Sequence, residues 1–364
     1  MADSTNVALD HESEPQASEL KSSSIHITHR HDASLTTRLI YKLLRPFGHK
    51  LASSKQQYPA GSPQLSVPSA IQKIADVHER KVDHIWIYDL RPKRPQPTNT
   101  EKQKNVHRIY YFAGGGWQMP PSPSHWKFFQ AMLQSLPDTI ITVVSYPLAP
   151  NSPAPIAIPQ LLKLYNTLLT ESTEKGETVT LAGDSAGGNI VLCLPLEALR
   201  HNAVAPRPHS ILAICPSANM KRGYPEMEAV EKVDPILRIP FIEKTAREWR
   251  GEWEDSDPRV SPIRADLGLL RRAGIKVDGV TGGYDLLAHD GVQFREKLGE
   301  ARVEGEWLQW DRMMHCWPLA KAYGIFPESE EAFRWIVGVL KRRAEEGGGR
   351  GTGSGAVQDG TAMD

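Results

Sequence analysis

The stretch around Ser185 constrains the fold of this chain more than any other. A β-branched run, Thr178-Val-Thr-Leu181, enters the sequence Gly183-Asp-Ser-Ala-Gly187, and a helix-like run leaves it. This order predicts a sharp turn between a strand and a helix, a nucleophile elbow, which holds the serine hydroxyl out above a sheet. The flanking glycines lack the Cβ atoms that would collide as the backbone closes. Ser185 is therefore a candidate nucleophile, with an ordinary turn serine as the alternative.

Strand-like and helix-like segments alternate from residue 81 onward. The expected strands cover residues 83–90, 106–112, 139–144, 178–181, 211–215, 275–280 and 307–310. The expected helices cover residues 126–136, 156–170, 189–200, 291–298 and 330–343, the last with Ser329 as its N-cap. Such alternation predicts an α/β protein with a mostly parallel central sheet and helices on both faces.

The two ends of the chain have the composition of disordered tails. Residues 1–33 are rich in Ser, His, Asp and Glu without an apolar period, and residues 346–364 are rich in Gly. Both are predicted to be disordered. His26, His29 and His31 resemble a metal-binding tract only loosely and are interpreted as solvated histidines.

An amphipathic helix is expected directly after the first tail. Apolar residues recur at helical spacing from Leu35 to Phe47, with basic residues between them. The apolar stripe would pack on the body of the protein or touch a membrane surface. Packing is favoured because one short stripe gives only marginal membrane affinity.

Composition excludes several classes of function. Lys plus Arg and Asp plus Glu both number 43, so nothing indicates a nucleic-acid partner. Cys193, Cys215 and Cys316 lack C-x-x-C spacing and are interpreted as reduced core thiols, not as a disulfide framework or a zinc site. The N-terminus does not resemble a signal peptide, and no run reaches the roughly 18 apolar residues of a membrane span. We therefore expect no integral membrane segment and a cytosolic location.

Three consecutive glycines, Gly114-Gly115-Gly116, follow the second expected strand. Such a loop can turn its backbone N–H groups outward, at the position that supplies donors for an oxyanion beside an elbow of this type. A merely flexible loop is the alternative. A phosphate-binding loop is disfavoured because no Gly-Lys-Ser/Thr follows the glycines.

Two further segments offer an acid and a histidine in the chain order Ser, acid, His. Asp285 follows a strand-like run directly, whereas its competitor Asp290 is interpreted as the N-cap of the next helix. His315 lies between the last expected strand and the terminal helix, and its position in this order favours catalysis over an ordinary core histidine. His289 is too close to Asp285 in the sequence to occupy a separate loop.

The set of motifs resembles the hormone-sensitive-lipase branch of the α/β-hydrolase family, over roughly residues 81–343. The matching segments are Gly183-Asp-Ser-Ala-Gly-Gly188, Gly114-Gly-Gly-Trp117, Tyr146-Pro-Leu-Ala-Pro150, Asp257-Pro-Arg-Val-Ser-Pro262, Gly282-Gly-Tyr-Asp285 and His315. The resemblance implies an α/β-hydrolase fold with a helical cap. The core would comprise residues 81–215 and 256–345, the N-terminal cap helices and linker residues 34–80, and the cap insertion residues 216–255.

The resemblance also implies a chemistry: cleavage of carboxylic esters with small or medium acyl groups, without a cofactor. Ser185 would attack, His315 would take its proton, and Asp285 would orient the imidazole. The N–H groups of Gly115, Gly116 and Ala186 would form the oxyanion hole. An apolar substrate wall is expected from Trp117, Met119 and Trp126.

The chain departs from the family pattern at three places. Ala113 stands where the family has a His before the glycines, so we expect a looser glycine loop. Ser145 and Pro147 replace the Asp and Arg that flank Tyr146 in the family. These changes suggest a specialised member, which leaves open an acyltransferase or a cyclase that uses the same elbow. A non-catalytic binding protein is a third alternative, against which the intact Ser, Asp and His argue.

Overall fold

A nine-stranded sheet forms the centre of the computed structural model, which describes residues 24–48, 56–93 and 106–348. The strands are β1 (Ile25–Arg30), β2 (Ala75–Val82), β3 (Ile85–Pro92), β4 (His107–Phe112), β5 (Thr139–Ser145), β6 (Thr178–Asp184), β7 (Ser210–Ile214), β8 (Lys276–Tyr284) and β9 (Gly305–Met314). Their spatial order is β1-β9-β8-β7-β6-β4-β5-β3-β2. In this spatial order, every pair of neighbours from β1 across to β5 is parallel. The last two pairs, β5 with β3 and β3 with β2, are antiparallel.

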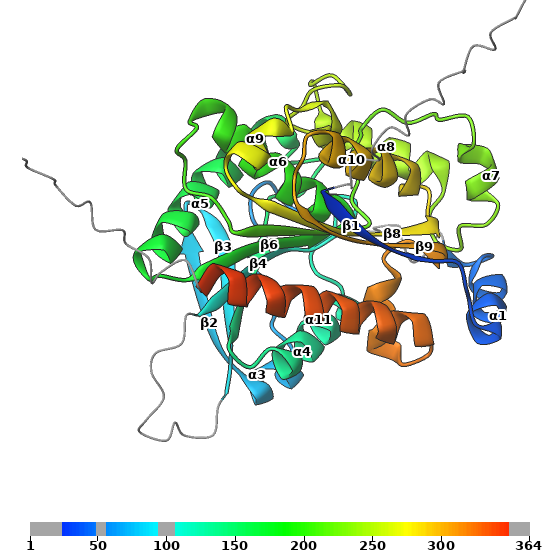
Figure 1. Cartoon of the computed structure of the whole chain (residues 1–364), viewed down its shortest axis with the longest axis horizontal. Coiled ribbons are helices and arrows are strands. Elements are labelled where there is room, and N and C mark those ends of the chain that lie inside the picture. The colour runs from blue at the N-terminus through cyan, green and yellow to red at the C-terminus, as the bar shows by residue number, and fades with distance from the viewer. Residues whose placement is uncertain (1–23, 49–55, 94–105, 349–364) are drawn as a thin grey trace, which may run out of the picture.

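Helices cover both faces of this sheet (Figure 1). The α-helices are α1 (Leu35–Leu44), α3 (Ser69–Ile74), α4 (Pro123–Ser135), α5 (Ala154–Glu174), α6 (Ser185–His201), α7 (Met227–Glu231), α8 (Ile239–Arg250), α9 (Gly268–Arg272), α10 (Ala288–Glu300) and α11 (Pro327–Gly348), and two 3₁₀ helices are η1 (Pro262–Arg264) and η2 (Trp317–Tyr323). In Figure 1, α4 and α11 lie below the sheet and α5, α6 and α10 above it. Every residue of β4 to β7 is buried, as expected for strands covered on both faces. The predicted α/β class is confirmed.

The two edges of the sheet correct the predicted boundaries. β1 lies in the segment predicted as a disordered tail and pairs with β9, with Ile25 opposite Gly305 and Arg30 opposite Trp310. β2 begins inside the segment assigned to the N-terminal cap and linker. Both edge strands carry charged or histidine side chains, which hide them from a search for apolar runs. At the other end, α11 reaches Gly348, whereas residues 1–23 and 349–364 of the predicted tails lie outside the described residues.

Helix α1 forms where an amphipathic helix was expected, but three leucines of its apolar stripe stay exposed. Leu35, Leu39 and Leu43 are 81%, 59% and 64% exposed. The helix docks instead through Thr37, which donates to Glu328 Oε2 at 2.6 Å, and Tyr41, whose hydroxyl accepts the N–H of Met314 at 3.0 Å. Tyr41 also belongs to the apolar core, and Ile40 and Leu44 pack against it, so both polar and apolar contacts hold this helix.

The predicted cap insertion, residues 216–255, contains α7 and α8. Arg238 at the start of α8 donates to the carbonyl of Arg45, which ties this segment to the end of α1. Trp249 of α8 is fully buried and stacks on Trp117 with a centroid distance of 5.6 Å. The segment thus contacts the glycine loop, and its role as a cap stays a prediction. Among the described helices, none is long and apolar enough to cross a membrane.

Candidate active site

The elbow predicted around Ser185 is present between β6 and α6. Ser185 has a φ of +52°, in the left-handed region that L-residues rarely adopt. A Cβ on Gly187 would lie 1.9 Å from the carbonyl oxygen of Phe112, so only glycine allows the helix to approach β4 this closely. The turn leaves Ser185 partly exposed at the end of the strand.

Asp285 and His315 meet at the ends of β8 and β9. His315 Nδ1 lies 2.8 Å from Asp285 Oδ2, and the second carboxylate oxygen accepts the N–H of Leu287 at 2.8 Å. Burial by itself lowers the pKa of His315, but the charge and hydrogen bond of Asp285 outweigh it and raise that pKa to about 9. The bond to Asp285 fixes the proton on Nδ1 and leaves Nε2 free to accept another.

Asp290, the competing acid, belongs to a different cluster. Its carboxylate pairs with Arg222 at 3.1 Å and accepts from Asn219 at 3.3 Å, and all three groups are buried. It is also not the N-cap of α10, because that position is Leu287 and Asp290 lies inside the first turn. The helix begins three residues earlier than the sequence indicated, which corrects the capping role. Asp290 instead neutralises the buried Arg222.

A second acid that the sequence did not single out supports the Asp285 loop. Asp234, from the predicted cap insertion, is fully buried and accepts the N–H of Leu286 at 3.0 Å. Burial and the nearby charge of Asp285 raise the pKa of Asp234 to about 7. The predicted cap insertion therefore helps to hold the loop that carries the candidate acid.

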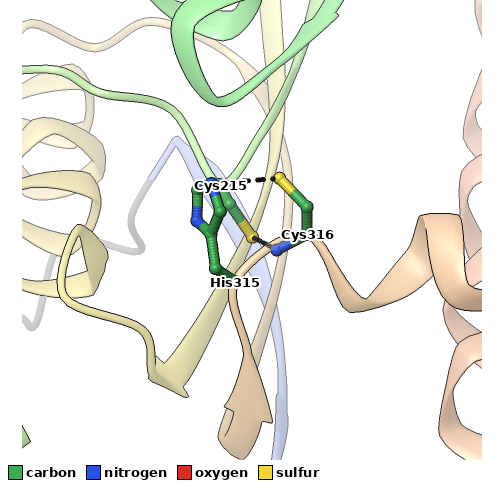
Figure 2. Close-up of side chains that lie close together, drawn as sticks. All are labelled: Cys215, His315 and Cys316. Carbon is green, nitrogen blue, oxygen red and sulfur yellow. Dashed lines mark hydrogen bonds between the residues drawn. The ribbon is translucent and has the colours of Figure 1, made fainter. Parts of the chain in front are cut away.

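Ser185, the third member of the expected triad, is not hydrogen-bonded to Asp285 or His315 in the described structure. Within the described residues, no hydrogen bond joins Ser185 Oγ to His315. Nε2 of His315 faces Cys316 Sγ at 3.5 Å instead, and the N–H of Cys316 donates to Cys215 Sγ at 3.4 Å (Figure 2). Cys193, Cys215 and Cys316 are free, and Cys316 is only partly buried. Two of the three cysteines thus lie beside the candidate base. Cys316 follows it directly in the sequence, whereas the approach of Cys215, 101 positions before Cys316, could not be read from their spacing.

The glycine loop passes directly beside the elbow. A Cβ on Gly114 would lie 3.0 Å from Ser185 Cβ, and the N–H of Gly114 donates to Asp184 Oδ1 at 3.0 Å. Gly115 and Gly116 have φ values of +133° and +60°. Across the described ranges, their N–H groups and that of Ala186 have no acceptor, so all three could bind an anion.

His125 anchors this loop through Asp184. His125 Nδ1 accepts the N–H of Ser122 at 3.0 Å, so Nε2 carries the proton that it directs at both Asp184 oxygens, at 3.1 and 3.2 Å. Burial alone raises the pKa of Asp184, but His125 and the other donors bring it below the usual value. Tyr146 also donates to the carbonyl of Ala113 at 2.7 Å. The looser loop expected from the missing family histidine is therefore not supported.

Two of the three residues expected in the substrate wall have little exposed surface. Trp117 is 2% exposed because it stacks on Trp249, and Trp126 is buried edge-on against Phe129 with a centroid distance of 5.7 Å. Large apolar side chains at these positions fill the core and offer little surface to a ligand. Met119 is partly exposed and adjoins Gly115. The substrate-wall role of all three residues stays a prediction.

The mostly parallel sheet with a serine elbow after β6 is the arrangement of the α/β hydrolases. The sequence pattern described as the alpha/beta hydrolase fold matches residues 109–319, more than half of the chain. The chain belongs to this family, and the resemblance to its hormone-sensitive-lipase branch is confirmed by the relatives that follow.

Two relatives and two solved structures illustrate the similarity. An esterase of Acinetobacter venetianus is 25% identical over 275 residues, 74% of this chain and 88% of that protein. Human hormone-sensitive lipase is 29% identical over 184 residues, which are 49% of this chain but only 16% of the lipase. Carboxyl esterase 2 of Tuber melanosporum matches with a TM-score of 0.69 at 16% identity, over 86% of this chain and all of that one. A hormone-sensitive lipase from a metagenome library matches with a TM-score of 0.67 at 19% identity and the same coverage.

Proposed function

We propose that this protein is a serine carboxylesterase that hydrolyses esters of small or medium acyl groups through an acyl-enzyme intermediate. The observation that carries the proposal is the 2.8 Å contact between His315 Nδ1 and Asp285 Oδ2, next to a strained serine elbow. The esterase names of the relatives support the same reaction class. A small-molecule ester is accordingly the proposed substrate.

The proposed reaction begins at Ser185. As Oγ bonds to the ester carbonyl carbon, its proton moves to His315 Nε2, and the electrons of the carbonyl double bond move to the oxygen. Asp285 holds the imidazole and stabilises the imidazolium that forms. When the intermediate collapses, the bond to the alkoxy group breaks, and His315 returns the proton to the departing alcohol. Water then repeats these steps on the acyl-enzyme and releases the acid.

The oxyanion would accept hydrogen bonds from Gly115, Gly116 and Ala186. Their N–H groups have no acceptor within the described residues, and the start of α6 adds its positive dipole end. Approach of Ser185 Oγ to His315 Nε2 is required, and such hydrogen bonds often form fully only with substrate bound. The proposal therefore requires that these two side chains meet when substrate binds.

Hydrolysis of p-nitrophenyl esters of increasing acyl length, by the natural protein and by Ser185→Ala, tests this proposal. We expect turnover to fall by about 10⁴ to 10⁶ in the variant, with an unchanged circular-dichroism spectrum. Mass spectrometry of the protein treated with an organophosphonate should locate the label on Ser185. Full turnover by a folded Ser185→Ala protein contradicts the proposal.

The same two measurements separate the alternatives. An acyltransferase or a cyclase would accept the label on Ser185 yet release little acid from activated esters until an acceptor is added. A non-catalytic binding protein would take up no label. Either result contradicts hydrolysis as the main activity.

A further inference from the structure

Three side chains that bind soft metals converge beside the elbow. Cys215 follows β7, and His315 and Cys316 follow β9 (Figure 2). One potential ligand atom of each residue lies within 4.8 Å of the other two. Cys215 and Cys316 have φ values of +46° and +49°, so the backbone holds both thiols in an unusual and defined conformation.

The separations suit a tetrahedral zinc site. Zinc binds cysteine sulfur at about 2.3 Å and histidine nitrogen at about 2.0 to 2.1 Å, so a tetrahedral S–N edge is about 3.5 Å. Cys316 Sγ and His315 Nε2 are 3.5 Å apart. Two sulfurs bound to one tetrahedral zinc are about 3.8 Å apart. Cys215 Sγ and Cys316 Sγ lie within 4.8 Å of each other, so their separation exceeds this value by at most about an ångström. Closing the site therefore requires only small movements of side chains.

The groups around these atoms favour a bound cation. Asp285 bonds to His315 Nδ1 at 2.8 Å, the carboxylate–histidine arrangement that presents Nε2 to a metal. The N–H of Cys316 donates to Cys215 Sγ at 3.4 Å and would stabilise a thiolate. Asp184 Oδ2 lies 3.8 Å from Cys316 Sγ and adds negative charge. Two thiolates and one neutral imidazole would neutralise a divalent ion.

We propose that Cys215, Cys316 and His315 form an inhibitory site for Zn²⁺ or another soft divalent cation. The two thiol protons and any proton on Nε2 leave to solvent, the ion binds both sulfurs and Nε2, and a fourth position stays open to water. Because Nε2 is the atom that would take the proton of Ser185, the bound ion blocks the proposed hydrolysis. The inhibition rests on the proposed function, whereas the binding of metal does not.

Binding is tested on reduced protein that has been freed of metal with EDTA and then titrated with Co²⁺. We expect one equivalent to produce the near-ultraviolet absorption of thiolate-bound cobalt. Cys215→Ser and Cys316→Ser should each weaken this absorption, and the double variant should lack it. If one of the two single variants does not fold, the other still tests the site. No absorption in the natural protein, or absorption that persists in the folded double variant, overturns the proposal.

A second cluster on the surface provides the matched control. His29 and His31 on the β1 edge each lie 2.6 Å from Asp311 and could also bind the ion. This cluster contains no sulfur, so His29→Ala/His31→Ala should keep the thiolate absorption. Loss of that absorption in this variant would instead contradict the assignment to the two cysteines.

Inhibition is tested with Zn²⁺ on p-nitrophenyl ester hydrolysis. Zn²⁺ should stop turnover by the natural protein, EDTA should restore it, and Cys215→Ser should need at least about tenfold more Zn²⁺ to halve its own metal-free turnover. Cobalt binding without zinc inhibition contradicts the inhibitory role. If the natural protein hydrolyses no ester, the proposed function fails, and the cobalt titration still decides whether the site exists.

Discussion

The carboxylate of Asp184 accepts a hydrogen bond from the Nε2–H group of His125, with both oxygens 3.1 to 3.2 Å from the ring nitrogen. Asp184 immediately precedes Ser185, and its Oδ1 also accepts the N–H of Gly114. One buried acid thus joins α4, the elbow and the glycine loop. His125 is therefore a positioning residue for the proposed oxyanion hole, although it contacts no reacting atom.

We expect His125→Ala to lower kcat by about tenfold with little change in KM. The substitution removes a charge-assisted hydrogen bond worth about 1.5 to 3 kcal/mol, and the glycine loop loses part of its anchor. His125→Gln can place an N–H donor near the Nε2 position and should recover much of the activity. Steady-state kinetics on one ester, with the exposed His26→Ala as control, measure this. Equal kcat for His125→Ala and the natural protein would exclude the positioning role.

Asp285→Asn and Asp290→Asn should fail in different ways. Asp285→Asn favours the wrong imidazole tautomer, and we expect kcat to fall by about 10⁴ in a folded protein. Asp290→Asn leaves the buried Arg222 without its charge partner, so the free energy of unfolding should fall by about 3 kcal/mol while kcat at low temperature is kept. Kinetics and urea unfolding of both variants make the comparison. The reverse assignment of acids would follow if Asp290→Asn alone abolished turnover.

The sequence predicted the parts of the fold and site that local patterns encode. β4 to β7 are buried on both faces, so each contains a run of mainly apolar and β-branched residues, and the elbow around Ser185 is one contiguous motif. β1 has no such signal because its stability depends on β9, with Ile25 opposite Gly305 far along the chain. Its pairing is a property of the assembled sheet.

The chemistry around His315 shows the same limit. Cys215 and Cys316 are 101 positions apart and meet only because β7 and β9 both flank β8. His125 reaches Asp184 from α4, and nothing in its neighbourhood distinguishes it from an ordinary buried histidine. Order along the chain was enough for Ser185, Asp285 and His315, whose roles remain a prediction. It could not reveal the residues that surround them.

The pH dependence of hydrolysis should reflect His315. Only the neutral imidazole can take the proton of Ser185, so kcat/KM should rise with pH through about 9, the raised pKa of His315. Burial opposes this rise of the His315 pKa, Asp285 is its main cause, and Cys215 and Asp234 also raise the pKa. Because the folded value exceeds the ordinary 6.5, its contribution to stability is complete below 6.5 and is lost as pH rises through 9.

Rate profiles from pH 6 to about 10, recorded with EDTA to keep the ring free of metal, give the apparent pKa. Asp285→Asn should move it downward. A plateau already reached at pH 7 in the natural protein would show that the imidazole is neutral there and would contradict the prediction.

The final prediction concerns Ala113, where the family has histidine. Ala113 is 1% exposed, and its carbonyl already accepts from Tyr146. A larger side chain would overpack this site, so Ala113→His should lower the free energy of unfolding by about 1 to 3 kcal/mol and should not raise kcat. Ala113→Ser, a smaller change at the same position, is the control. It should retain most of the free energy of unfolding and most of kcat. Urea unfolding and steady-state kinetics test this, and a faster, equally stable Ala113→His enzyme would mean that the glycine loop lacks the anchor that Asp184 and Tyr146 provide here.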